Sequence, residues 1–308
     1  MRGGYGLGPY DPRWIGPYRV DGLLGQGGMG RVYLGRDPVD RPVAIKVIKD
    51  DLAGNAEYLR RFREEAANAR RIARQHTAQV LDFNVDRGSP YLVTEYVEGP
   101  TLRDRIRHGR PIVGSELDQL AFVLATALQA MHQVGLIHRD LKPENVILSS
   151  MGPRVIDFGV ARVSDGPHEP DRNSTFVGTL GYIAPEILAS RPATAKVDIF
   201  AWGATVAFAG TGRPTFGDGN IEQRRYRTLG QAPDLSGLEL PLRDVVDRAL
   251  HKSPAMRPSA ADLVRVLNGG AALGAGTDEL SAGLDGELPP RPERELTLEQ
   301  EILRRMGM

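Results

Sequence analysis

A glycine cluster between two strand-like runs is the feature that most constrains the fold of this chain. Gly25, Gly27 and Gly30 form a G-x-G-x-x-G pattern, with Val32 two positions further on. Glycine lacks a Cβ and adopts backbone conformations barred to other residues, so such a loop can approach phosphates closely. In dinucleotide-binding folds these glycines open a helix. Here strand-like residues and the apolar, β-branched run 43–48 follow, which predicts a strand–turn–strand hairpin. A plain hairpin turn is the alternative for this loop taken alone.

The spacing of apolar residues divides the chain into a strand-rich part and a helix-rich part. Segment 55–74 has helical spacing and is the one long helix expected before residue 98, where strands are expected at 18–24, 31–36, 43–48, 80–85 and 91–96. Beyond residue 99 the pattern favours long helices, at 117–134, 197–210, 242–250 and 260–267. The sequence therefore predicts an α+β chain, with a small sheet and one major helix followed by a mostly helical part.

The two ends of the chain differ in composition from its middle. Residues 1–17 are rich in glycine, proline and aromatic residues and lack the apolar core of a signal peptide, so we expect a flexible N-terminus. From residue 270 the chain is rich first in glycine and alanine and then in proline, glutamate and arginine, which predicts a linker. Segment 296–306 has the pattern of a short amphipathic tail helix, with disorder as the alternative. The most apolar stretches, 120–137 and 199–210, are expected as buried helices, so no membrane span is predicted.

Charge and cysteine content exclude several classes of function. The chain has 39 basic and 39 acidic residues, so no global field points to nucleic acid or to an anionic membrane. It has no cysteine, which excludes disulfides, thiol nucleophiles and cysteine metal sites and suits a cytoplasmic location. Any affinity for phosphate must therefore come from a local site.

The run His138–Asn145 supplies such a local site. The Asp140 carboxylate can accept a hydroxyl proton, and the Lys142 ammonium can stabilise a phosphoryl group in transfer. The Asn145 amide oxygen can ligate a divalent cation, because hard cations favour oxygen. No second histidine lies at metal-ligand spacing from His138, so we expect His138 to be structural rather than a zinc ligand. These residues together indicate phosphoryl transfer to an alcohol.

Lys46 ends the strand-like run Val-Ala-Ile-Lys and needs a partner for its charge if it is buried. Nucleotide phosphates are one candidate partner, and a carboxylate on the next helix is another. That helix offers Glu57, Glu64 and Glu65, and neighbouring helical residues point about 100° apart, so only one of the last two can face the sheet. Asp157 opens the triplet Asp-Phe-Gly soon after the run His138–Asn145, and such a triplet taken alone is more often an ordinary turn.

The octapeptide at 138–145 resembles the catalytic loop of protein kinases, and Lys142 is the form typical of serine/threonine kinases. The glycine loop and the segment 62–69 are similar to those of the bacterial eukaryotic-like serine/threonine kinases, of the actinobacterial type. The resemblance covers about residues 18–267. It implies a bilobal protein-kinase fold over residues 18–269, with a small antiparallel sheet lobe at 18–97 and a larger helical lobe at 98–269. Residues 270–308 would follow as linker and tail helix.

The resemblance also implies the roles of the site residues. Asp140 would be the catalytic base, Lys142 and Lys46 would stabilise phosphate charge, and Glu65 would pair with Lys46, with Glu64 as runner-up. Asn145 and Asp157 would bind Mg²⁺, with Mn²⁺ as an alternative ion. ATP would lie against Leu24, Gly25, Gln26, Gly27, Gly28, Met29, Gly30, Arg31, Val32, Ala44, Lys46, Glu95, Val97 and Leu148.

The same resemblance implies two structural contacts and a mode of regulation. Glu186 would form a buried ion pair with Arg257, and Asp198 would brace the catalytic loop. Ser174 and Thr175 lie where relatives are autophosphorylated, and a phosphate there would meet an arginine such as Arg139. Substrates would be proteins. Relatives also form homodimers through the small lobe, which no residue here proves.

Two other functions compete with an active protein kinase. A pseudokinase would lack a catalytic residue, but every catalytic position is intact. Small-molecule phosphotransferases of the aminoglycoside or choline type lack the equivalents of Lys142, of Thr179 and of the Ala-Pro-Glu run that ends at Glu186. Segments 217–220 and 224–227 depart from the family's usual pattern, which indicates altered substrate docking or simply a solvated charged face.

Overall fold

The computed structural model describes residues 6–27, 30–49, 53–72, 76–85, 90–157 and 180–270. The first part of the chain forms a six-stranded antiparallel sheet in the order β1-β2-β3-β4-β6-β5. Its strands are β1 (Trp14–Ile15), β2 (Tyr18–Gly27), β3 (Gly30–Arg36), β4 (Pro42–Ile48), β5 (Val80–Asn84) and β6 (Tyr91–Glu95). The predicted hairpin around the glycine cluster is confirmed, because Gly27 pairs with Gly30 across the β2–β3 turn.

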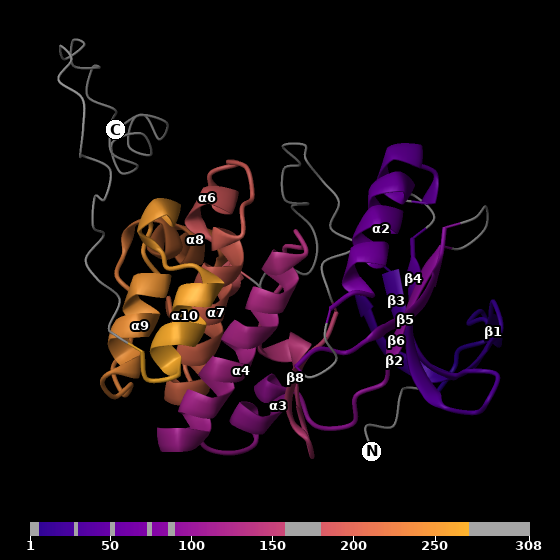
Figure 1. Ribbon diagram of the computed structural model, residues 1–308, viewed down its shortest axis with the longest axis horizontal. Helices are drawn as coiled ribbons and strands as arrows, with labels where there is room; N and C mark the ends of the chain where they lie inside the picture. The colour runs from indigo at the N-terminus through magenta and orange to yellow at the C-terminus, as the bar shows by residue number, and fades with distance from the viewer. Residues whose placement is uncertain are drawn as a thin grey trace, which may run out of the picture. The chain divides into compact units, whose positions relative to one another are not determined.

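Helix α2 (Ala56–Ala69) accompanies this sheet (Figure 1). It begins at Asn55, whose side chain accepts a hydrogen bond from the backbone N–H of Tyr58. The helix ends five residues earlier than the predicted segment 55–74. Phe62 and Ala66 lie on its buried face and join the same core as Leu92 of the sheet. The other face of the sheet has a separate core that includes Ile45 and Val93. These contacts fix α2, and with it Glu65, against one face of the sheet.

The sheet begins within the segment 1–17, which the sequence predicts to be flexible. Trp14 and Ile15 form β1 and pair with Arg19 and Tyr18, and Ile15 is buried. Asp11 also accepts hydrogen bonds from Tyr33 and Arg31. A two-residue strand is too short to give a periodic signal in the sequence, so this edge of the sheet could not be found from alternation alone.

One glycine is required by the close approach of two strands. Gly30 has a φ of 151°, and a Cβ built on it would lie 1.8 Å from the carbonyl oxygen of Val47 on β4. Any other residue would therefore push β3 away from β4, which carries Lys46 one position earlier. The glycine loop and the lysine are positioned by one pairing of strands.

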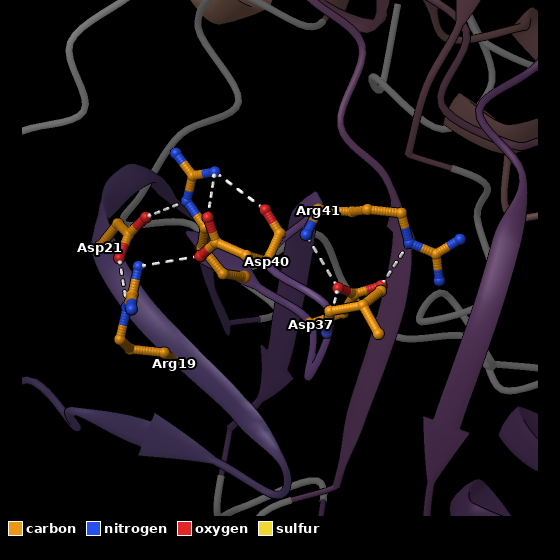
Figure 2. A network of polar contacts seen from close by, with 7 residues as sticks. Arg19, Asp21, Asp37, Asp40 and Arg41 are labelled. Atoms are coloured by element: carbon orange, nitrogen blue, oxygen red, sulfur yellow. Dashed lines mark hydrogen bonds and ion pairs between the residues drawn. The ribbon is translucent and has the colours of Figure 1, made fainter.

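An exposed network of arginine and aspartate side chains closes the turn between β3 and β4 (Figure 2). Asp37 accepts hydrogen bonds from the backbone N–H groups of Val39 and Arg41 and from the Arg41 side chain. Arg19 lies between Asp21 and Asp40, at 3.2 and 3.3 Å. Ion pairs this exposed contribute little stability in water, so the network orders the turn more than it stabilises the fold.

The rest of the described chain is mostly helical. Its helices are α3 (Leu102–Arg107), α4 (Gly114–Gln133), α6 (Pro185–Leu188), α7 (Lys196–Thr211), α8 (Ile221–Gly230), α9 (Leu242–Ala249) and α10 (Ala260–Leu267), with 3-10 turns η1 (Pro143–Asn145), η3 (Leu180–Tyr182) and η4 (Pro254–Met256). A short antiparallel hairpin, β7 (Val146–Ser149) with β8 (Gly152–Val155), follows η1. Helices α4, α7 and α10 lie side by side (Figure 1).

Helix α7 forms the centre of the helical lobe. Every residue from Val197 to Gly210 is buried, so this helix is apolar on all sides, as expected for a helix surrounded by others. The indole of Trp202 donates a hydrogen bond to the carbonyl of Ala121 at 2.9 Å, which ties α7 to α4. Asp198, near the start of α7, is a buried charge in this apolar helix. Its partners lie in the catalytic loop.

No helix in the described ranges combines the length and the apolar character that a bilayer crossing requires. The predicted tail helix at 296–306 lies outside the described residues. The sequence analysis predicted neither α3 nor α8. Each carries a capping signal that could have revealed it, at Thr101 with Asp104 and at Asn220 with Gln223.

Candidate active site

The catalytic loop is held by one buried carboxylate. Asp198 accepts hydrogen bonds from the backbone N–H groups of His138 and Arg139, each at 2.8 Å, and from Nε2 of His132 at 2.8 Å. The predicted bracing role of Asp198 is therefore confirmed. Arg139 has a φ of 61°, in the left-handed region that costs a non-glycine residue about 1–3 kcal/mol. The bonds to Asp198 fix this strained turn and so aim the next residue, Asp140.

Asp140, Lys142 and Asn145 converge within this loop, as predicted. The Lys142 ammonium lies 2.8 Å from Oδ2 of Asp140. The Asn145 amide nitrogen donates to the backbone oxygen of Asp140 at 2.8 Å and to its Oδ2 at 3.2 Å. Neither bond uses the Asn145 carbonyl oxygen, which is the atom able to ligate a cation.

Asp157 is brought to the same place by the β7–β8 hairpin. Val146 pairs with Val155, and the backbone N–H of Ile156 donates to the carbonyl of Asn145 at 2.9 Å. Asp157 is the next residue, and its φ of 59° is again in the left-handed region. One amide oxygen and one carboxylate thus lie on adjacent strand ends. This donor set fits Mg²⁺, which takes oxygen ligands and usually keeps several waters and substrate phosphates.

Lys46 of β4 pairs with Asp157. Burial alone would raise the pKa of the Asp157 carboxyl, but the Lys46 ammonium and its hydrogen bond lower that pKa below its ordinary value. The carboxylate therefore stays ionised at neutral pH. Lys46 is itself mostly buried, with 13% of its side chain exposed, so the pair meets the need for a charge partner that the sequence predicted.

In this structure Lys46 does not pair with its predicted partner, Glu65. Oε1 of Glu65 lies 3.6 Å from Nη1 of Arg139 instead, and Lys46 has taken Asp157. The choice between the two glutamates does favour Glu65, because Glu64 is exposed and pairs with Arg60 at 2.6 Å. Helical spacing identifies the face on which a side chain lies, but it does not identify which of two nearby cations it will meet.

The predicted ATP-lining residues of the sheet lie on β2, β3, β4 and β6, and Val97 follows β6. Leu24, Gly25, Gln26 and Gly27 end β2, and Gly25 pairs with Val32, Gln26 with Arg31 and Gly27 with Gly30. Ala44 pairs with Leu34 on one side and Thr94 on the other. Glu95 ends β6, with its side chain 2.7 Å from Arg154, and Val97 follows it. Gly28 and Met29 lie outside the described residues.

Leu148 is placed elsewhere than predicted. It lines a cavity of about 200 Å³ with Ile112 and Leu120, on the side of α4. Successive side chains of a strand point to opposite faces, so Ile147 faces the other way. Its Cγ2 would lie 3.0 Å from a Cβ built on Gly99, in the segment that follows β6. The sequence analysis missed Ile147. Val146 is apolar and expected to be buried, so alternation along β7 places the next residue, Ile147, on the opposite face.

The predicted structural anchor is confirmed. Glu186 and Arg257 form two parallel hydrogen bonds, both 2.7 Å, and both side chains are buried. Arg257 also donates to the carbonyl oxygens of His251 at 2.7 Å, Lys196 at 2.9 Å and Lys252 at 3.2 Å. Every direction of the guanidinium is thus used, and the segment at Glu186 is fixed to η4.

The candidate phosphorylation sites Ser174 and Thr175 lie outside the described residues. The same holds for Thr179 and for the Phe and Gly of the Asp-Phe-Gly triplet. Within the described part of the chain, no cluster of three or more histidine or acidic side chains is arranged to hold a metal ion. The candidate metal site therefore consists of Asn145 and Asp157.

Comparison with known proteins identifies the family. The protein kinase domain family matches residues 18–266. The chain is 41% identical over 262 residues to the probable serine/threonine-protein kinase PkwA of Thermomonospora curvata. The matched region covers 85% of this chain and 35% of PkwA. It is 40% identical over 258 residues to the serine/threonine-protein kinase AfsK of Streptomyces coelicolor, which covers 83% of this chain and 32% of AfsK. The chain thus spans about a third of the length of these curated relatives.

A solved structure agrees with the sequence relatives. The crystal structure of the Mycobacterium tuberculosis PknI kinase domain superposes with a TM-score of 0.65 at 28% identity, and it covers 82% of this chain and 95% of that one. The predicted fold, a small antiparallel sheet lobe followed by a helical lobe, is therefore confirmed. The chain belongs to the protein kinase family, in its bacterial eukaryotic-like serine/threonine branch.

Proposed function

We propose that this chain is an ATP-dependent protein serine/threonine kinase, which transfers the γ-phosphoryl group of ATP to serine or threonine hydroxyls of proteins. The observation that supports this most is the convergence of Asp140, Lys142 and Asn145 in one braced loop, beside a paired Lys46 and Asp157. Positioning and charge stabilisation are most of what an enzyme must supply for phosphoryl transfer.

Each of these residues has a role in the proposed reaction. Asp140 orients the substrate hydroxyl and accepts its proton while the hydroxyl oxygen bonds to the γ-phosphorus. The bond between the γ-phosphorus and the bridging oxygen breaks, and ADP leaves with that electron pair. Lys142, held 2.8 Å from Asp140, neutralises charge on the group in transfer. Lys46 leaves Asp157 to hold the nucleotide phosphates.

Asn145 and Asp157 would hold the Mg²⁺ ion, with Mn²⁺ as the alternative. The ion supplies charge neutralisation on the phosphates. Glu65 would then replace Asp157 as the partner of Lys46, which requires it to leave Arg139. Ile147, rather than Leu148, would lie beneath the adenine, and Glu95 and Val97 would bind its edge through their backbones.

We further propose that Ser174 and Thr175 are autophosphorylated and that the domain acts in the cytoplasm. The chain has no cysteine, so its fold does not depend on an oxidising compartment. A homodimer that forms through the small lobe stays a prediction. Mass spectrometry of the purified protein, with and without ATP, tests the two phosphorylation sites, and unmodified peptides after incubation would contradict them.

Incubation with γ-labelled ATP and Mg²⁺ tests the proposed activity, with casein or the chain itself as phosphate acceptor. Label on serine or threonine that disappears in Asp157→Asn would support the proposal. Asp247→Asn is the matched control, because it removes an exposed carboxylate of α9 and should leave transfer unchanged. Label on a small alcohol or aminoglycoside, but not on protein, would favour a small-molecule phosphotransferase. No transfer to any acceptor would favour a pseudokinase.

A further inference from the structure

Four polar side chains from separate elements meet beside the catalytic loop. They are Arg103 of α3, Glu144 of η1, Tyr182 of η3 and Arg224 of α8, and we call them the Arg103–Arg224 cluster. Nε of Arg103 lies 3.2 Å from Oε1 of Glu144. Nη2 of Arg224 would lie 3.5 Å from a Cβ built on Gly181, next to Tyr182.

Tyr182 links the members of this cluster. Burial raises the pKa of its phenol, and the nearby Glu144 carboxylate raises it further, whereas Arg103 and Arg224 lower it. All three charged groups therefore lie close enough to act on one buried ring. Arg103 is also positioned by Phe208, whose ring centroid lies 6.0 Å from its guanidinium carbon.

The cluster lies within reach of a peptide bound at Asp140. Glu144 follows Asp140 by four residues, so their Cα atoms are at most about 14 Å apart. An extended peptide advances about 3.3 Å per residue. A side chain within about four positions of the acceptor serine or threonine can therefore meet the cluster.

The charges of the cluster favour an anion. It contains two guanidinium groups and one carboxylate, and Arg103 pairs with Oε1 of that carboxylate, so the cluster has one guanidinium in excess. Burial lowers the pKa of Arg224, but a guanidinium remains protonated at any physiological pH. Asp218 is the other carboxylate that acts on Arg224, and Glu222 lies on the exposed face of α8.

Helix α8, which carries Arg224, is tied to α6. Nη2 of the neighbouring Arg225 donates to the carbonyl of Leu188 at 2.9 Å, which ties α8 to the end of α6. The same helix carries Glu186, which Arg257 anchors. A solvated charged face, the plainer interpretation of segment 224–227, fits the exposed Arg225 and Tyr226 but not the half-buried Arg224 against Gly181.

We propose that the Arg103–Arg224 cluster selects protein substrates that carry an aspartate or glutamate within about four positions of the phosphorylated residue. Carboxylates match guanidinium groups in charge and in geometry. This proposal rests on the proposed kinase function and names its substrate class.

Peptide kinetics test the proposal. The peptides carry one threonine in an alanine–glycine background, with aspartate placed at each position from four before to four after it, and each has an asparagine counterpart. We expect kcat/KM for at least one aspartate position to exceed its asparagine counterpart about tenfold, the size of one charge-assisted contact of about 1.4 kcal/mol. The ratio should fall as salt rises. A ratio near one at every position, or a preference for lysine, would overturn the proposal.

Variants of Arg224 and Arg103 test whether the cluster causes the preference for aspartate peptides. Arg224→Gln should reduce the aspartate-to-asparagine ratio, and Arg103→Gln should also raise kcat/KM for lysine-flanked peptides, because it frees the Glu144 carboxylate. Arg243→Gln, an exposed arginine of α9, is the matched control and should keep the ratio. If the aspartate-to-asparagine ratio of kcat/KM is unchanged in both Arg224→Gln and Arg103→Gln, the proposal is overturned. A preference for phosphoserine with none for aspartate would show that a primed substrate is recognised instead.

The failure of the proposed function can be told apart from the failure of this inference. Labelling of all peptides without an acidic preference would refute only the substrate class. If no peptide is labelled, the kinase function fails, and fluorescence anisotropy then measures binding of the aspartate and asparagine peptides to the same protein. Equal affinities would overturn the cluster as an acidic docking site, and tighter binding of aspartate that Arg224→Gln removes would support it.

Discussion

The Glu186–Arg257 pair and the Lys46–Asp157 pair both join a carboxylate to a cation, but their surroundings fix them to different degrees. Arg257 is fully buried, makes a two-bond contact with Glu186 and donates to three backbone carbonyls. Lys46 and Asp157 meet through a single contact, with 13% and 32% of their side chains exposed. The guanidinium of the first pair uses all its donors in this network, whereas the second pair depends on one contact, and in the proposed reaction Lys46 would exchange Asp157 for Glu65 and phosphates. The first therefore stabilises the fold, and the second can change partners during a reaction.

The largest effect on folding is expected from breaking the Glu186–Arg257 pair. Glu186→Ala leaves a buried guanidinium without its carboxylate, which should lower the free energy of unfolding by about 3–5 kcal/mol. Urea denaturation followed by circular dichroism measures this loss. A loss below about 1 kcal/mol would show that the anchor is no more stabilising than a surface pair.

Lys46→Met should affect the transfer rate strongly and stability weakly, whereas Glu186→Ala affects mainly stability. Transfer from ATP should fall about 10²–10³-fold, as expected when one charge-stabilising group is removed from an active site. Stability should fall less than in Glu186→Ala, because Lys46 makes a single contact and the Asp157 that it leaves is partly exposed. Initial rates with labelled ATP and a thermal melt of the same preparation measure both quantities. Unfolding of the variant, or normal rates, would contradict the comparison.

A smaller effect on the transfer rate is expected when Glu65 is replaced, and the neighbouring Glu64 serves as its control. Glu65→Gln should lower the transfer rate about tenfold, because Glu65 is expected to support Lys46 once it leaves Arg139. Glu64→Gln should leave the rate unchanged, because Glu64 pairs with Arg60 on the exposed face of α2. Equal rates in the two variants would show that Glu65 stays with Arg139 during turnover.

Lys252 gives the anchor region a dependence on pH. Burial first, and then the charge of Arg257, lower the pKa of Lys252 to about 8. In the unfolded chain the amine keeps its proton up to its ordinary pKa of about 10.4, so the unfolded state binds more protons between these values and stability should rise with pH. We expect a rise on the order of 1 kcal/mol, because partial solvation and the Phe216 ring 4.2 Å away both favour the charged form.

Denaturation of the chain and of Lys252→Met across pH 8 to 10.5 measures this dependence. The variant should lose the rise, since it has no amine to titrate. Parallel stability curves for the two proteins would assign the rise to other groups.

Contacts that depend on local spacing could be predicted from the sequence. Asp140, Lys142 and Asn145 lie on one short loop, so their convergence follows from chain connectivity. The hairpin at the glycine loop could be predicted because strand-like residues lie on both sides of it. The Glu186–Arg257 contact spans distant segments, and it came from the family resemblance rather than from any spacing.

The contacts that could not be predicted depend on choices between near neighbours in space. Glu65 pairs with Arg139 and Lys46 with Asp157, and the helical period of α2 predicts neither pairing. Leu148 and Ile147 differ by one position in a strand, and one position reverses the face. The cluster at Arg224 depends on how α8 packs against η3 and α6, which lie far from it in the sequence.

Phosphoryl transfer by Asp140→Asn tests the central claim most directly. The variant keeps the size of the side chain and the hydrogen bonds of the braced loop, but it removes the negative charge and the proton acceptor. We predict a fall of about 10²–10⁴-fold in the initial rate with labelled ATP and Mg²⁺, with an unchanged melting temperature. A variant that folds normally and transfers phosphate at close to the wild-type rate would contradict the assignment of the active site.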